Sequence, residues 1–113
     1  MLRRDYTALK KIADEISVAI GFMGNSTLAE FLSDELLKRG VAMTAINIGE
    51  LVKNLSSEFR LEHNDIPWKD IAGFRDLAAH KYGSLNMTDV YITVTDDFPD
   101  LKSNIDKILA SES

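Results

Sequence analysis

The sequence predicts an all-α fold, a mostly antiparallel bundle of five or six helices in a single domain over residues 1–113. Apolar residues recur at steps of three and four along most of the chain, the spacing that places them on one face of a helix. Both prolines fall where a helix is expected to begin. The chain has no cysteine, so packing must hold the fold together without disulfides or thiolate metal sites. A chain of this length can bury one core but not two.

The first helix is expected to run to about Phe22, because Gly21, Gly24 and Asn25 favour its end. Its apolar stripe consists of Leu2, Tyr6, Leu9, Ala13, Ile16 and Ile20. Charged residues interrupt the first eleven positions, and the longest apolar run is far shorter than the roughly 20 residues that cross a bilayer. We therefore expect a soluble cytoplasmic protein with no signal peptide and no membrane contact.

A short helix should follow, capped by Ser26 or Thr27, because Thr27 and Glu30 have the spacing of a capping box. Asp34 can then open the longest helix, which should reach Ser57 or beyond. Apolar residues occupy this stretch at steps of three and four.

Two glycines, Gly40 and Gly49, lie inside the longest predicted helix. Each costs about 1 kcal/mol relative to alanine, which indicates places where another helix approaches closely. Glu50 follows Gly49 and could face Arg75 and fix its guanidinium group. This is a hypothesis, because an exposed Glu50 is the commoner outcome.

Residues 61–65 are predicted to form a polar connection in which His63 is a turn residue rather than a ligand. Pro67 fits the first turn of the next helix, which Gly83 should end. Trp68 is expected in the core. No second histidine lies at metal-ligand spacing from His63, so we predict no metal. We also expect no cofactor.

The last third of the chain should hold two more helices. Asn86 can cap a short one over the β-branched residues around 90–94. These residues could also form a strand, but a lone strand would have no partner in a helical chain. The last helix should begin at Pro99, with Asp96 and Asp97 as its cap.

The net charge is −5, and the acidic excess lies in residues 61–113. This balance argues against broad nonspecific binding of RNA, because neutralisation of phosphates by lysine and arginine dominates such affinity. It leaves room for a local basic cleft, for which Lys69, Arg75 and Lys81 are the candidates. Lys69 and Lys81 are therefore predicted to bind RNA if the chain acts on it.

The candidate site is the helix end from Arg75 to Tyr82, where Asp76 and His80 are one turn apart. Tyr82 falls nearly above Arg75 two turns later. A histidine held by a carboxylate can transfer a proton near neutral pH, and an arginine can stabilise the charge of a phosphoryl transition state. These are the parts of a metal-free ribonuclease. Separate acid and base groups would need a second copy of the motif.

A solvated helix end also carries such residues, and on spacing alone that is the commoner reading. A resemblance to a known family favours the functional interpretation of this helix end. The stretch Ile66–Tyr82 resembles the central segment of HepT-like proteins in the HEPN superfamily, whose pattern is arginine, a polar residue, a spacer, histidine, any residue and tyrosine. Arg75, Asp76, His80 and Tyr82 stand at those positions. The likeness continues upstream through residues 48–51 and downstream through residues 97–101.

The resemblance implies a HEPN-like homodimer with its site between two subunits, which would supply the second histidine. It also implies an RNase toxin of a toxin–antitoxin pair. Arg75 and His80 would carry catalysis, and a minimal nucleotidyltransferase antitoxin would silence the toxin by AMPylation of Tyr82. On the chemistry of the motif itself, Asp76 would orient the imidazole of His80. One position departs from the family pattern, since Asp76 replaces the common asparagine. An acid there could hold His80 protonated or repel a phosphate.

Two alternatives stay open. One is a catalytically silent HEPN module that binds the nucleotidyltransferase. The other is a helical dimer with no role in nucleic-acid chemistry, which would show neither toxicity nor AMP transfer. Growth arrest on expression without a partner would favour the toxin.

Overall fold

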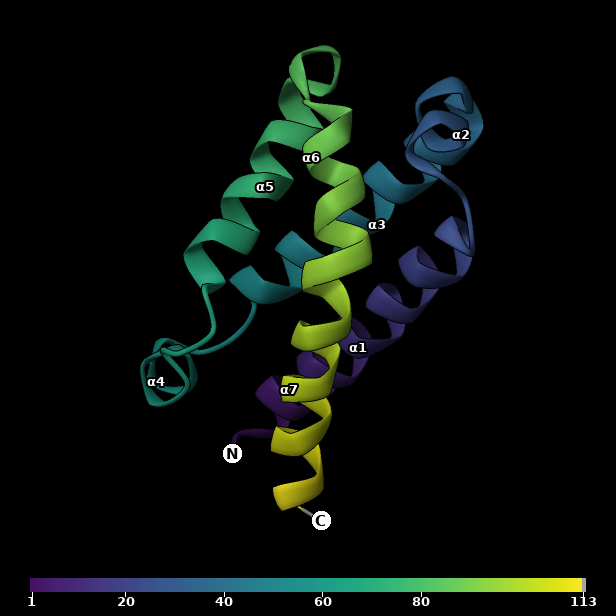
Figure 1. Cartoon of the computed structure of the whole chain (residues 1–113). Coiled ribbons are helices and arrows are strands. Elements are labelled where there is room, and N and C mark those ends of the chain that lie inside the picture. The colour runs from purple at the N-terminus through teal and green to yellow at the C-terminus, as the bar shows by residue number, and fades with distance from the viewer. Residues whose placement is uncertain (113) are drawn as a thin grey trace.

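The computed structural model describes residues 1–112, apart from the side chain of Leu77, and all of its regular structure is helical, as predicted (Figure 1). The elements are α1 Arg3–Met23, α2 Leu28–Ser33, α3 Glu35–Lys53, α4 Ser57–Glu62, α5 Trp68–His80, a 3-10 turn Tyr82–Ser84, α6 Met87–Ile92, a π turn Thr93–Asp97 and α7 Phe98–Ser111. Successive long helices run in alternating directions, which confirms the mostly antiparallel arrangement. The predicted domain limit at residue 113 lies just outside the described residues.

Helix α3 is the centre of the bundle, because it packs against α1 on one side and α5 on the other. Helix α7 packs along α1, and the chain ends meet where the N-terminal ammonium lies 3.9 Å from Glu112 Oε2. The most deeply buried large side chains are Leu9, Ile12, Ile16, Phe31, Val41, Ile48, Val52, Leu55, Val90 and Ile105. Each contributes about 1.5–3 kcal/mol of burial free energy. In the described part of the chain, none of the helices combines the length and apolar character needed to cross a membrane.

The predicted caps of the short and long helices are confirmed. Thr27 and Glu30 form the complete capping box at α2, and Asp34 Oδ1 accepts from the backbone N–H of Leu37 at the start of α3. Asn86 Oδ1 accepts from the N–H groups of Thr88 and Asp89 at the start of α6. The chain entries into these helices are therefore fixed by local hydrogen bonds.

The predicted end of the longest helix is wrong, because α3 stops at Lys53 and a separate helix α4 begins at Ser57. Buried Asp5 on α1 accounts for the break. Its Oδ1 accepts from the Ser56 N–H and its Oδ2 from the Ser56 hydroxyl, both at 2.7 Å. The Ser56 hydroxyl oxygen in turn accepts from the Phe59 N–H and caps α4. This tertiary contact starts a new helix in a stretch that we expected to be partly connection.

The predicted capping role of Asp96 and Asp97 is also wrong, because α6, the π turn and α7 form one unbroken ribbon (Figure 1). Both residues lie inside the π turn. Val90, Val94 and Phe98 are all buried, and their spacing of four exceeds the 3.6 residues of an α turn. The wider π turn keeps the three on one face. The strand alternative for residues 90–94 is excluded.

Candidate functional site

The closest approach of α3 and α5 assembles the candidate site. A Cβ atom on Gly49 would overlap the Cβ of Arg75 and would lie 2.7 Å from its Cγ. The prediction of a close helix approach at Gly49 is therefore confirmed. Because Gly49 has no side chain, the first carbon atoms of the Arg75 side chain pack directly against α3. At Gly40 an added Cβ would meet the Phe22 ring at 3.4 Å, which is an ordinary contact.

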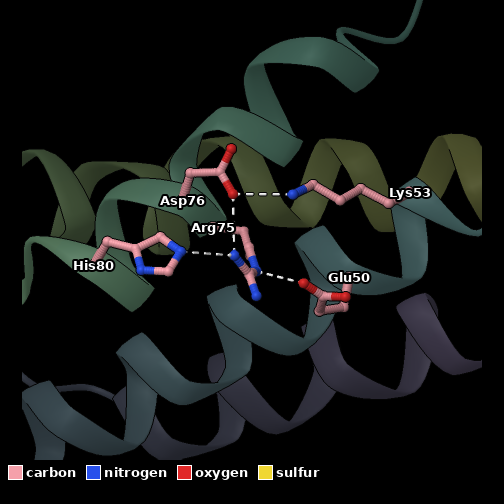
Figure 2. Close-up of polar contacts among 5 residues, drawn as sticks. All are labelled: Glu50, Lys53, Arg75, Asp76 and His80. Carbon is pink, nitrogen blue, oxygen red and sulfur yellow. Dashed lines mark hydrogen bonds and ion pairs between the residues drawn. The ribbon is translucent and has the colours of Figure 1, made fainter.

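Arg75 lies at the centre of a cluster of charged side chains (Figure 2). Its Nε is 2.5 Å from Glu50 Oε1, an ion pair without hydrogen-bond geometry, and its Nη1 donates to Asp76 Oδ1 at 3.1 Å. The Arg75 side chain is 20% exposed. The hypothesis that Glu50 faces Arg75 is confirmed by this contact. Glu50 also lines a groove between α1 and α3.

His80 is the last residue of α5, is exposed, and points its ring toward Arg75 (Figure 2). Its Nε2 lies 3.4 Å from Arg75 Nη1. Nε2 can accept from Nη1 only when the imidazole is neutral and carries its proton on Nδ1. Arg75 and His80 are thus adjacent, with a proton-transfer group and a permanent positive charge at one solvent-facing position.

Asp76 contacts Arg75 and a residue that sequence reasoning missed. Lys53, on the last turn of α3, donates from Nζ to Asp76 Oδ1 at 2.9 Å. The Lys53 ammonium, followed by the Arg75 guanidinium, holds the pKa of the Asp76 carboxyl below its usual range. We expected Asp76 to orient His80, but its oxygen is bonded to the two cations, and Arg75 lies between it and His80.

Tyr82 lies beyond the end of α5, in the 3-10 turn. The guanidinium carbon of Arg39, on α3, lies 4.9 Å from the centre of its ring. The Tyr82 hydroxyl oxygen is buried and has no hydrogen-bond partner among the described residues. The tyrosine is therefore near the site in sequence but has its oxygen covered in this conformation.

The two other predicted basic residues, Lys69 and Lys81, are both exposed. Lys81 follows His80 and is exposed. Lys69 lines an open groove beside α4 together with Arg60 and Trp68. Trp68 is buried, as predicted, and its Nε1–H donates to the His63 carbonyl oxygen at 3.0 Å. Among the described residues, no group of three or more histidine, aspartate and glutamate side chains is placed to hold a metal ion.

The fold and site define an all-α protein with an arginine and a histidine paired at a helix end. The family model described as ribonuclease HepT-like matches residues 6–108. The chain belongs to this HepT-like ribonuclease family, which confirms the resemblance drawn from the motif.

Named relatives agree with this assignment. The chain is 35% identical over 104 residues to "Putative RNase TTE0752" of Caldanaerobacter subterraneus subsp. tengcongensis, covering 92% of this chain and 93% of that protein. It is 31% identical over 105 residues to "Probable ribonuclease HepT" of Thermococcus cleftensis, covering 93% and 94%. It is 34% identical to "Gamma-glutamylcyclotransferase and putative RNase MJ0434" of Methanocaldococcus jannaschii, covering 89% of this chain and 46% of that longer protein. No solved structure matches the chain.

Proposed function

We propose that this protein is a metal-independent endoribonuclease in which Arg75 and His80 cleave RNA phosphodiester bonds. The observation that carries the proposal is the 3.4 Å approach of His80 Nε2 to Arg75 Nη1, within a chain of the HepT-like ribonuclease family. An exposed imidazole beside an anchored guanidinium offers both a proton acceptor and a phosphate-binding charge.

In the proposed reaction, the imidazole of His80 takes the proton from an RNA 2′-hydroxyl, and the 2′-oxygen attacks the adjacent phosphorus. The bond from phosphorus to the 5′-oxygen breaks, leaving a cyclic phosphate and a 5′-alkoxide that a second His80 protonates. Arg75 stabilises the added negative charge on the phosphoryl oxygens. Before RNA binds, Asp76 holds Arg75 beside His80 through its contact with Arg75 Nη1 at 3.1 Å.

We further propose that two chains form a homodimer across the face that bears residues 75–82. Each chain supplies one His80, and the reaction needs one imidazole as base and another as acid. Two copies would also double the positive charge around the cleft, where we assign Lys69 and Lys81 to contacts with RNA phosphates. We expect the protein to act in the cytoplasm.

The regulatory part of the proposal is that a minimal nucleotidyltransferase antitoxin silences the protein by transferring AMP to Tyr82. Tyr82 matches the tyrosine of the family motif. Its hydroxyl oxygen is buried, so the 3-10 turn Tyr82–Ser84 must open before AMP can be added. Loss of the Arg39 contact with the ring would accompany that opening.

Expression of the protein without a partner tests the toxin claim. Wild type and His63→Ala should arrest growth and degrade cellular RNA, whereas His80→Ala should do neither. His63 is the matched control because it is the other histidine of the chain and packs on Phe59 away from Arg75. Harmless expression of soluble wild type would instead favour the catalytically silent HEPN module.

Co-expression with the nucleotidyltransferase tests the silencing claim. Wild type and Tyr6→Phe should become harmless and gain the mass of one AMP group. Tyr82→Phe should stay toxic and unmodified. Tyr6 is a fair control because it is an exposed tyrosine on α1. Relief of Tyr82→Phe toxicity by the partner would remove Tyr82 from the regulatory proposal.

A further inference from the structure

Lys53 and Arg75 direct their charges at the same oxygen atom. Lys53 Nζ lies 2.9 Å and Arg75 Nη1 lies 3.1 Å from Asp76 Oδ1 (Figure 2). The two cations come from different helices, α3 and α5, and meet because Gly49 lets these helices touch. A single anionic oxygen between two cationic donors is also how a non-bridging phosphate oxygen is held.

We propose that Lys53 and Arg75 form a phosphate-binding subsite for RNA, and that the Asp76 carboxylate occupies this subsite when RNA is absent. The proposal rests on the proposed ribonuclease function and adds to it a substrate-binding residue and an internal competitor. When RNA binds, a phosphate oxygen replaces Asp76 Oδ1 between the two cations. Arg75 keeps its position through its ion pair with Glu50.

The exposure of the groups allows this exchange. The Asp76 and Lys53 side chains are 53% and 42% exposed, and ion pairs at such sites contribute little net free energy. Asp76 can therefore rotate into solvent at small cost. Lys53 has a long flexible side chain that can follow the phosphate. Arg75, 20% exposed and held by α3, is the fixed half of the subsite.

The competing explanation is that the Lys53 and Asp76 pair only ties α3 to α5. The two explanations predict different directions of change in RNA affinity for variants of Lys53 and Asp76. If the ion pair only holds α3 against α5, removal of either partner loosens the site. Lys53→Ala and Asp76→Asn then change RNA binding in the same direction. If Asp76 competes with phosphate, Asp76→Asn strengthens RNA binding and Lys53→Ala weakens it.

The chain contains a matched pair for control. Lys102 and Asp106 on α7 form an exposed ion pair at 2.7 Å, and α7 packs on α1 rather than at the site. Lys102→Ala and Asp106→Asn make the same changes in net charge as the two test variants. Any difference between the pairs therefore reports position rather than overall charge.

The experiment measures binding of a mixed-sequence 2′-O-methyl oligoribonucleotide, which lacks the attacking hydroxyl, by fluorescence anisotropy over a range of salt. Lys53→Ala should weaken binding roughly threefold to tenfold and reduce the magnitude of the slope of log affinity against log salt by about 0.7. Asp76→Asn should tighten binding several-fold. Lys102→Ala and Asp106→Asn should each stay close to wild type.

Equal binding by all four variants, or weaker binding by both Lys53→Ala and Asp76→Asn, would overturn the subsite and leave the ribonuclease proposal intact. A wild type that binds no RNA would overturn both. The ribonuclease proposal fails separately if cleavage of ordinary RNA does not depend on His80, whatever the affinities of the Lys53 and Asp76 variants.

Discussion

Glu50 is the residue that fixes the position of Arg75. Its Oε1 lies 2.5 Å from Arg75 Nε, while the opposite nitrogen, Nη1, faces Asp76 and His80. The carboxylate thus occupies the edge of the guanidinium group away from His80. We propose a positional role for Glu50, because its contact with Nε leaves Nη1 of Arg75 facing Asp76 and His80, where the proposed function puts the RNA phosphate.

Replacement of Glu50 by alanine should therefore lower RNA cleavage by roughly tenfold to a hundredfold, because a misplaced catalytic group costs on that order. The expected loss is in kcat, with a smaller change in KM. Glu62→Ala, at the exposed end of α4, is the control and should cleave like wild type. Unchanged cleavage by Glu50→Ala, with Arg75 still ordered, would remove Glu50 from the site.

The lowered pKa of Asp76 makes the stability of the fold depend on pH. Its folded pKa lies below the unfolded value, so its ion pairs stabilise the fold above the unfolded pKa, and that stability is lost as the pH falls through the folded value. Lys53 is the largest cause of the shift. Lys53→Ala should raise the pKa of Asp76 toward its ordinary range in a carboxyl NMR titration. Lys102→Ala should leave it unchanged, and an unchanged pKa in Lys53→Ala would contradict the Lys53 contact.

The contact between α3 and α5 depends on the glycine at position 49, where any side chain would collide with Arg75. Gly49→Ala should destabilise the protein by about 1–3 kcal/mol and reduce cleavage, because the added methyl group overlaps the Arg75 stem. Gly73→Ala on α5 is the control, since a Cβ there meets nothing within 4 Å. It should be neutral or stabilising by up to about 1 kcal/mol, since alanine favours helices. Chemical denaturation and a cleavage assay check both, and equal stability of the two variants would contradict the close approach.

The sequence predicts the elements that depend on local patterns. The capping box at Thr27, the cap at Asp34 and the helix start near Pro67 rest on neighbours within four residues, and all three helices form. The last of them begins at Trp68, one residue after Pro67. The break after Lys53 was missed because it depends on Asp5, which lies 51 residues from Ser56 in sequence. Periodicity carries no information about such a partner.

The same limit applies to the candidate site. Arg75, Asp76 and His80 could be found because they share one helix, and Glu50 could be suspected from its place beside Gly49. Lys53 lies 23 residues before Asp76 and reaches it only through the packing of α3 on α5. Helical spacing predicts a contact between Asp76 and His80. In the structure, Asp76 instead contacts the permanent positive charges of Lys53 and Arg75, which attract a carboxylate more strongly than a neutral imidazole does.

At the scale of the whole molecule, the bundle holds α3 and α5 so that one helix anchors the arginine that the other presents. The chain has a net charge of −5. Two carboxylates and two cations surround the proposed reaction centre, so the local balance of charge at this junction matters for binding of an anion. Family membership and this geometry support RNA cleavage as the function. The proposed toxin role depends on that cleavage, whereas the proposed homodimer does not.

The most direct measurement is cleavage of RNA by purified wild type, His80→Ala and His63→Ala in the presence of EDTA. We expect wild type and His63→Ala to cut the RNA and leave cyclic phosphate ends. His80→Ala, folded as shown by circular dichroism, should lose at least about a hundredfold in rate. RNA that is cut equally by wild type and His80→Ala, or that stays intact with soluble wild type, would contradict the ribonuclease proposal.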